Sequence, residues 1–334
     1  WYPNFYVPAR STAKSVFTSI TGIPDVSAIK TATRNPYITH QRSVINALVQ
    51  HEKHYMLGGS AGWANMSALI HNSIQGVNLH EEKHWTSPIV DVWGISDYSL
   101  ITEASAILKR ATPPFLGYIQ TAANHSPYTI ADDKSGFIAQ QRTSAELKDN
   151  GFASLEQYNA VRLLDHNIGK LFAQFKRNKL YDNTIFVLFS DHQASSVQVK
   201  HLPEYIFQFG MGELPVPLII HAPNLINPEV DYTFGSLPDL LPTIVGLFPQ
   251  TYLNTSLGRD LAWAKGKNLP TYGFLQASRT SVAFNGDQIA SVNHVTGQVI
   301  SANIDDQGRA LMTKQNNPMV EAAKAYYLAS QYLL

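Results

Sequence analysis

The sequence predicts an α/β fold in which helices cover a mostly parallel sheet, with a small antiparallel subdomain near the C-terminal end. Short apolar runs rich in branched and aromatic residues alternate with longer stretches of helical spacing. The runs are almost continuously apolar, which is typical of strands covered on both faces. After Pro242 the pattern changes to short alternating pieces separated by turn residues, which indicates hairpins.

The elements follow from this pattern in chain order. We expect strands at residues 55–57, 115–121, 184–190 and 217–221. We expect helices at residues 13–21, 41–50, 61–71, 98–109 and 155–178. The clearest helix is 155–178, where Leu163, Leu171 and Phe175 belong to an apolar stripe and basic residues gather near the end.

Two further segments complete the predicted fold. Residues 124–150 are polar and rich in turn residues, so they read as an excursion over the sheet edge, where active-site loops usually lie. Residues 278–303 contain the turn signals Asn285-Gly286 and Thr296-Gly297, and residues 318–334 read as a terminal amphipathic helix. The predicted domains are therefore residues 1–261 and an appended 262–334.

Composition excludes several classes of function. Lys+Arg and Asp+Glu both number 25, so the chain carries no electrostatic footprint for nucleic acid. It has no Cys, which excludes a disulfide framework, a thiolate nucleophile and Cys-ligated zinc. A nucleophile must then be a hydroxyl, a carboxylate or an imidazole. The longest apolar runs fall far short of the roughly 20 residues that span a bilayer.

The sharpest local signal is the pair Asp191-His192 at the end of the apolar run 186–189. Ligand sites in open α/β sheets lie at the carboxyl ends of the strands, and a carboxylate beside an imidazole suits a metal ion. The alternative is an Asp that caps a turn beside a surface His. The residues alone leave both interpretations open.

Thr12 and His125 are the next candidates. Thr12 opens an apolar helical run, so its hydroxyl would lie where the helix N-terminus favours an anion such as a phosphoryl group, unless it is only an N-cap. His125 leaves the strand 115–121 beside a turn. It either donates to a phosphoryl oxygen and serves as a general acid, or only bonds the loop backbone.

Seven segments in order resemble one family. They are Tyr2-Pro3-Asn4-Phe5 ahead of Arg10 and Thr12, Gly58-Gly59 through Trp63 to Met66, Trp93-Gly94-Ile95-Ser96-Asp97, Asn124-His125-Ser126-Pro127-Tyr128, Tyr181-Asp182-Asn183-Thr184 leading to Asp191-His192, residues 237–247, and Leu257-Gly258-Arg259-Asp260-Leu261. Together they resemble the extracytoplasmic catalytic domain of lipoteichoic acid synthase type sulfatases, in the alkaline phosphatase superfamily. The resemblance covers roughly residues 1–261 and implies a three-layer α/β/α sandwich.

The resemblance also implies a metal-dependent site. Thr12, Asp191 and His192 would bind one divalent cation, with Thr12 also the nucleophile and His125 in contact with the transferred group. Mn²⁺ is the expected ion, with Mg²⁺ and Zn²⁺ as alternatives, because the set combines one imidazole with oxygen ligands. The family's fourth ligand, a Glu ending the first strand, and membrane-anchoring helices are expected upstream of residue 1.

Weaker substrate-binding candidates are Arg10, Lys14, His201 and Trp63, each with a simpler interpretation. Arg10 and Lys14 flank Thr12 and would balance a dianion, or they line a solvated helix start. His201 would contact the substrate or lie on the surface, and Trp63 would wall the pocket or belong to the core. Leu57 and Met66 stand where lipoteichoic acid synthase carries a His and an Arg, so the head group is expected to differ.

The function that this resemblance implies is transfer or hydrolysis of a phosphoryl or sulfuryl ester. A lipid phosphodiester is the expected substrate class, with a glycan ester as the other possibility, and the catalytic domain would lie on the periplasmic or extracellular side of the cell membrane. The alternative is a non-catalytic lipid-binding or regulatory domain that kept the fold.

Overall fold

The structure is a computed structural model that describes residues 1–193, 202–212, 214–313 and 316–334. Its central strands form three hydrogen-bonded groups. β2 (Glu52–Leu57) pairs in parallel with β3 (Val77–His80) on one side and with β6 (Phe115–Gln120) on the other. β1 (Phe5–Tyr6) pairs in parallel with β9 (Gly235–Ser236), whereas β7 (Phe186–Phe189) pairs antiparallel with β8 (Leu218–His221). The expected parallel sheet is confirmed, with β8 reversed relative to β7.

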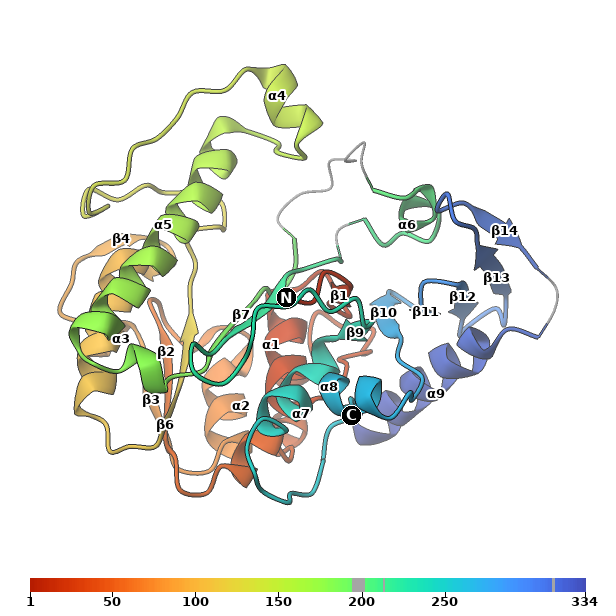
Figure 1. The fold of residues 1–334 in the computed structure, drawn as a ribbon, viewed down its shortest axis with the longest axis horizontal. Helices are drawn as coiled ribbons and strands as arrows, with labels where there is room; N and C mark the ends of the chain where they lie inside the picture. Colours follow the sequence, from red (N-terminus) through yellow and green to blue (C-terminus); the bar gives the residue numbers. More distant parts are fainter. Residues whose placement is uncertain (194–201, 213, 314–315) are drawn as a thin grey trace.

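Helices cover both faces of β2, as Figure 1 shows. Met56 points into a core formed with α3 (Asp97–Arg110) and α5 (Leu155–Arg177). Its neighbours Tyr55 and Leu57 point into the opposite core. The helices on that side are α1 (Thr12–Thr21), α2 (Met66–Ser73) and α7 (Leu240–Val245). Because successive side chains of a strand point to opposite faces, β2 contributes to both helical layers, one on each side of the sheet.

The C-terminal part forms a five-stranded antiparallel sheet with a helix on one face. The strands follow one another in the sheet as they do in the chain: β10 (Gly273–Ala277), β11 (Thr280–Phe284), β12 (Gln288–Asn293), β13 (Val299–Ile304) and β14 (Ala310–Met312). α9 (Pro318–Leu333) packs on Ala283 and Ala290. Phe284 and Ile289 enter the core that contains β1, so this sheet shares a core with the main body.

The remaining regular elements are short. They are β4 (Ile89–Asp91) paired antiparallel with β5 (Gly94–Ile95), α4 (Ser144–Asp149), α6 (Glu204–Gln208) and α8 (Leu261–Gly266). Between β6 and α5 the chain holds only α4, which matches the expected loop-rich excursion (Figure 1). Within the described ranges, no helix combines the length and apolar character needed to cross a bilayer.

Two helix predictions need correction. Residues 41–50 contain only the 3₁₀ turn Val44–Ala47, because the Ser43 side chain accepts from Ile45 N–H and Asn46 binds the backbone of neighbouring segments. Residues 61–65 are not α-helical either: Ala64 and Asn65 adopt left-handed backbone angles, and α2 begins only at Met66. Side-chain bonds to the backbone compete with helix in both places, since Ser60 Oγ accepts from Gly62 N–H and Glu81 Oε2 from Ala61 N–H.

Candidate functional site

The N-terminus of α1 begins at Thr12. Ser11 occupies the N-cap position with an extended backbone, but its side chain makes no capping hydrogen bond. The first turn contains no acidic residue, so nothing on the helix itself neutralises its positive end. Thr12 is half-buried there, with its hydroxyl turned toward the residues that follow β7. The simple N-cap interpretation of Thr12 is excluded, because Thr12 is the first helical residue.

The structure brings Thr12 together with His192 and Asp191. Thr12 Oγ1 lies 3.2 Å from His192 Nε2, and His192 Nε2 lies 3.5 Å from Asp191 Oδ2. Two sequence-distant candidates and their neighbour therefore meet at one point, between the start of α1 and the carboxyl end of β7. Such an end of a strand is where α/β folds place their ligands.

Hydrogen bonds determine which atoms face this point. His192 Nδ1 lies 2.8 Å from the Gln193 carbonyl oxygen, which only accepts, so Nδ1 carries the proton in the neutral ring. Nε2 then has its lone pair directed at the site, and the Thr12 hydroxyl donates to it. Asp191 Oδ1 accepts from His192 N–H, which leaves Oδ2 facing Nε2. Two lone-pair-bearing atoms that face each other favour a cation between them.

The donor set suits a divalent cation. Ligand atoms bound about 2.1 Å from one ion lie about 3.0–3.4 Å apart when the angles are octahedral or tetrahedral. The distances from His192 Nε2 to Thr12 Oγ1 and to Asp191 Oδ2, 3.2 and 3.5 Å, are close to these separations. Among the described residues, no three His, Asp or Glu side chains are grouped so that they could hold a metal ion. The role of the Thr12 hydroxyl as a third donor beside Asp191 and His192 stays a prediction.

His125 lies in the loop after β6 with its ring exposed. Its Nδ1 is 2.9 Å from the Ser126 carbonyl oxygen, and its ring packs against Trp93. No hydrogen bond or ion pair joins His125 to Thr12 in the part of the chain that the structure describes. The role of His125 toward a transferred group stays a prediction.

The flanking basic residues Arg10 and Lys14 both bind backbone carbonyls. Arg10 Nη2 donates to the Gly210 carbonyl at 3.1 Å. Lys14 Nζ donates to the Asp25 and Ser27 carbonyls at 3.3 and 2.6 Å. Burial lowers the pKa of Lys14, and the nearby Asp25 carboxylate opposes this. Lys14 thus holds the loop after α1 in place, and a substrate role for either residue stays a prediction.

Two further candidates cannot be joined to the site by any described contact. Trp63 begins the 3₁₀ turn Trp63–Asn65 and packs half-buried against the core that contains α1 and α2. His201 lies outside the described residues. Both assignments stay predictions.

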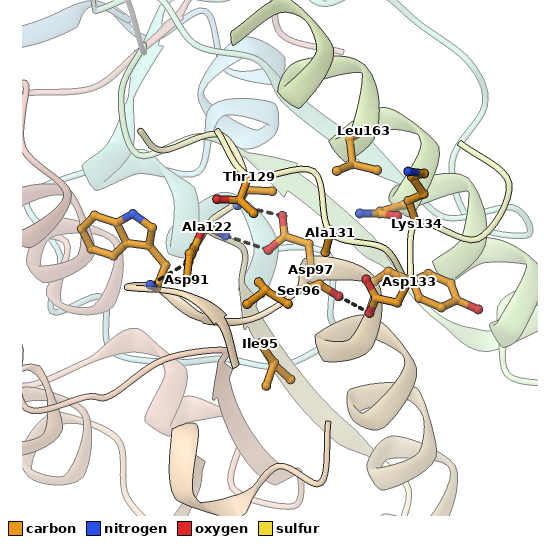
Figure 2. A pocket seen from close by; sticks show the side chains of 15 residues that line it. Asp91, Ile95, Ser96, Asp97, Ala122, Thr129, Ala131, Asp133, Lys134 and Leu163 are labelled. Atoms are coloured by element: carbon orange, nitrogen blue, oxygen red, sulfur yellow. Dashed lines mark hydrogen bonds between the residues drawn. The ribbon is translucent and has the colours of Figure 1, made fainter. Parts of the chain in front are cut away.

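A buried carboxylate that sequence reasoning did not single out holds the loop that carries His125. Asp97, the first residue of α3, accepts hydrogen bonds from Ala122 N–H at 2.8 Å and Ala123 N–H at 3.1 Å (Figure 2). Burial raises the pKa of Asp97 to about 6, and these two N–H groups oppose the rise. The signal in the sequence was the Trp93-Gly94-Ile95-Ser96-Asp97 motif, in which Asp97 had no separate role.

A second carboxylate ties the loop to the same helix end. Ser96 donates its hydroxyl to Asp133 Oδ2 at 2.5 Å (Figure 2). Ser99 donates its hydroxyl to the same oxygen at 2.6 Å. A small cavity of about 20 Å³ lies here between α3, α5 and the loop, with Asp97 and Asp133 in its lining. It has room for about one water molecule, so it is a packing feature and not a substrate pocket.

Comparison with solved structures defines the fold class. A protein in the alkaline phosphatase superfamily from Vibrio parahaemolyticus superposes with a TM-score of 0.78 at 22% identity, covering 99% of this chain and 77% of that chain. The lipoteichoic acid synthase LtaP from Listeria monocytogenes gives a TM-score of 0.78 at 16% identity, covering 99% and 83%. This chain therefore has the alkaline phosphatase-like α/β fold, as the sequence motifs implied.

Sequence comparison gives the family. The model of the family described as Sulfatase matches residues 1–250. The chain belongs to the sulfatase family, and the resemblance drawn from its motifs is confirmed.

Its curated relatives include lipoteichoic acid synthases. Lipoteichoic acid synthase 1 of Bacillus subtilis is 26% identical over 248 residues, which are 68% of this chain and 35% of that protein. The lipoteichoic acid synthase of Staphylococcus saprophyticus is 23% identical over 351 residues, covering 98% and 48%. The chain thus spans between about a third and a half of the length of these relatives.

Proposed function

We propose that this chain is a metal-dependent catalytic domain that transfers or hydrolyses a phosphoryl or sulfuryl ester through a covalent intermediate on Thr12. The observation that carries the proposal is the position of Thr12 Oγ1, 3.2 Å from His192 Nε2, with Asp191 Oδ2 another 3.5 Å away. A hydroxyl beside an imidazole lone pair and a carboxylate is the arrangement that a metal-activated nucleophile requires.

Thr12, Asp191 and His192 would hold one divalent cation, for which Mn²⁺ is the best candidate and Mg²⁺ or Zn²⁺ the alternatives. When bound, the ion lowers the pKa of the coordinated hydroxyl and polarises the ester oxygen. The Gln193 carbonyl supports this role, because its hydrogen bond to Nδ1 keeps Nε2 free of a proton.

The reaction then takes two displacements. Thr12 Oγ1, having lost its proton to water, attacks the phosphorus or sulfur atom in line, and the bond to the leaving alcohol's oxygen breaks. His125, entering this step with a proton on each ring nitrogen, donates the one on Nε2 to that oxygen, so the alcohol leaves neutral and the ring is left as the Nδ1–H tautomer. Water or an acceptor alcohol next attacks the same atom, gives its proton to His125, and releases the Thr12 oxygen.

The substrate class comes from the relatives. The curated relatives named above are lipoteichoic acid synthases, so we propose a lipid phosphodiester as substrate. A glycan phosphate or sulfate ester is the second choice within the same chemistry. A location on the outer side of the cell membrane belongs to the same proposal.

The test uses the whole chain with Mn²⁺ and three probes: phosphatidylglycerol, a nitrophenyl phosphodiester and a nitrophenyl sulfate. We expect turnover of one of them and a phosphoryl or sulfuryl adduct on the Thr12 peptide in acid-quenched samples analysed by mass spectrometry. Thr12→Ala should reduce kcat at least about a thousandfold, as loss of a nucleophile does.

Ser11→Ala is the matched control. Ser11 precedes Thr12, and its hydroxyl makes no capping bond. The change should therefore leave kcat, and the equilibrium constant for unfolding, within about twofold of the wild type. If the chain binds phosphatidylglycerol vesicles but turns over no probe and forms no adduct, the enzyme proposal fails. The lipid-binding regulatory domain then takes its place.

A further inference from the structure

The ring of His125 lies against Trp93, a residue with no assigned role. Trp93 connects β4 to β5, and its ring centroid is 4.1 Å from that of His125, at an interplanar angle of 49°. Its indole Nε1 also donates to the Ser126 carbonyl oxygen at 2.8 Å. Trp93 therefore contacts the His125 loop twice, once through its ring and once through its N–H.

The Ser126 carbonyl oxygen receives two donors. His125 Nδ1 lies 2.9 Å from it, and a carbonyl oxygen only accepts, so the neutral ring carries its proton on Nδ1. The lone pair is then on Nε2. An exposed imidazole in water exchanges between its two tautomers, and its bonds to backbone compete with water. The indole packed on one side of the His125 ring excludes water there and restrains the ring.

The backbone beneath Trp93 is rigidly supported. Gly94 has φ +103°, and a Cβ added to it would lie 2.1 Å from the Gly58 carbonyl oxygen. A Cβ added to Gly59 would lie 2.5 Å from the Trp93 carbonyl oxygen. Asp91 Oδ1 accepts from Trp93 N–H at 2.8 Å. The turn that carries Trp93 thus lies directly on the glycines that follow β2.

The loop backbone has its own supports. Ala122 and Ala123 donate their N–H groups to Asp97, His125 N–H donates to the Ala122 carbonyl, and Tyr128 N–H donates to the His125 carbonyl. None of these bonds involves the Trp93 side chain. Removing that side chain should therefore release the His125 ring while the path of the backbone persists.

We propose that Trp93 is a positioning residue that holds the His125 imidazole in its Nδ1–H tautomer and presents Nε2 to the substrate. The restraint of the ring stands on the contacts above. Its consequence for turnover rests on the proposed function, in which Nε2 meets the transferred group or the leaving alcohol. When the ring orientation is already fixed, the entropic cost of orienting the ring is not part of the activation barrier.

The first test is spectroscopic and needs no substrate. Two-bond ¹H–¹⁵N correlation spectra of ¹⁵N-histidine-labelled protein, recorded above the pH at which the imidazoles are protonated, report which ring nitrogen carries the proton. The His125 signals, identified by their loss in His125→Gln, should show Nδ1–H in the wild type. Trp93→Ala should shift them to a mixture of tautomers, and Trp93→Phe, which keeps the ring but lacks the N–H, should fall between.

Trp85→Phe is the matched control. Trp85 is also half-buried and donates its indole N–H to a backbone carbonyl, that of Leu57, at 2.8 Å, but it neighbours His80 and not His125. Its substitution should leave the His125 signals unchanged. In the transfer assay, Trp93→Ala should lower kcat about tenfold or more with little change in KM, whereas Trp85→Phe stays within about twofold.

Each outcome decides something. If His125 keeps its Nδ1–H signature in a folded Trp93→Ala protein, the positioning role is wrong. If the tautomer shifts but the wild type turns over no phosphate or sulfate ester, the restraint of the ring stands and the proposed function fails. If the tautomer shifts and kcat does not fall in an active enzyme, Trp93 orients a residue that the reaction does not use, and the catalytic part is overturned.

Discussion

Thr12 Oγ1 and His192 Nε2 lie 3.2 Å apart although 180 positions separate the two residues in the chain. One lies at the start of α1 and the other just beyond β7, and neither helix nor strand alone brings them near. The contact joins the candidate nucleophile to the candidate metal ligands. It also makes the metal part of the proposal testable without any substrate.

Asp191→Asn should weaken Mn²⁺ binding by at least about a hundredfold in isothermal titration calorimetry, because the variant loses an anionic donor beside His192 Nε2. The wild type, with Mn²⁺ at about 100 times its Kd, should gain about 2.7 kcal/mol in unfolding free energy, and the variant should not.

The chain contains its own control for that change. Asp165-His166 repeats the Asp-His sequence on α5, far along the chain from β7, and Asp165 is exposed. Asp165→Asn should bind Mn²⁺ as the wild type does. Equal Mn²⁺ affinity in the Asp191→Asn protein and the wild type would contradict the proposed site.

Asp97 should make stability depend on pH between about 4 and 6. Burial raises its pKa in the folded protein to about 6, above the ordinary value of 3.8, so the folded state holds the proton more tightly than the unfolded state. Its stabilising contribution is complete below about pH 4 and is lost as the pH rises through 6. The change amounts to about 3 kcal/mol.

Urea unfolding of the wild type and Asp97→Asn across this range measures the effect. The difference in unfolding free energy between the two proteins should change in favour of the variant as the pH rises. Asp132→Asn, in the exposed part of the same loop, should keep the slope of the wild type. Parallel curves for the wild type and Asp97→Asn would show that this carboxyl titrates alike in both states.

Arg259 should stabilise the junction between the main body and the C-terminal sheet. Its Nε lies 3.2 Å from Asp239 Oδ1, its Nη2 donates to the Tyr272 carbonyl, and its guanidinium lies 4.1 Å from the Tyr272 ring centroid. Asp239 is fully buried. Arg259→Met should therefore cost about 3–5 kcal/mol, because it leaves a buried carboxylate without its cation.

The control for this pair lies on the surface. Arg309 pairs with Asp305 at 2.7 Å, but its side chain is 59% exposed. Arg309→Met should cost no more than about 1 kcal/mol in the same denaturant titration. Similar losses in the two variants would mean that the buried pair contributes no more than an exposed one.

Gly94→Ala should destabilise the protein more than Gly76→Ala. Both glycines have positive φ, so both substitutions strain the backbone, by about 1–2 kcal/mol. Only Gly94 also lies against backbone, with the Gly58 carbonyl oxygen 2.1 Å from the added Cβ, whereas Gly76 has open space. The excess for Gly94, about 1–3 kcal/mol, should appear in thermal or urea unfolding. Equal effects would contradict the tight contact beneath Trp93.

Much of the architecture was predictable from local pattern. The helix predicted at 155–178 is α5, and the strand predicted at 115–121 is β6. The helix predicted at residues 41–50 was wrong. The apolar spacing there is helical, but Ser43 and Asn46 bind the backbone around them, so only a 3₁₀ turn forms. Periodicity reports burial and does not report such bonds.

The candidate site divides in the same way. The Asp-His pair after a strand and the Thr at a helix start were visible in the sequence. Lys14 was a candidate for balancing a dianionic substrate or for lining a solvated helix start. Only the structure shows that its ammonium binds the carbonyls of Asp25 and Ser27 in the loop after the same helix. Asp97 had no separate role in the sequence. In the structure it is buried, and its carboxylate accepts hydrogen bonds from the N–H groups of Ala122 and Ala123, just before His125.

The sequence by itself determined the order of the long helices and of β2, β6, β7 and β8, the hairpins after residue 278, and the residue types that the family motifs supply. Those features depend on spacing and turn chemistry within a few residues. The tertiary structure alone decided that Thr12 meets His192, that Trp93 packs on His125, and that Asp97 is buried. These depend on how strands register and layers pack across long separations in the chain, which local periodicity does not encode.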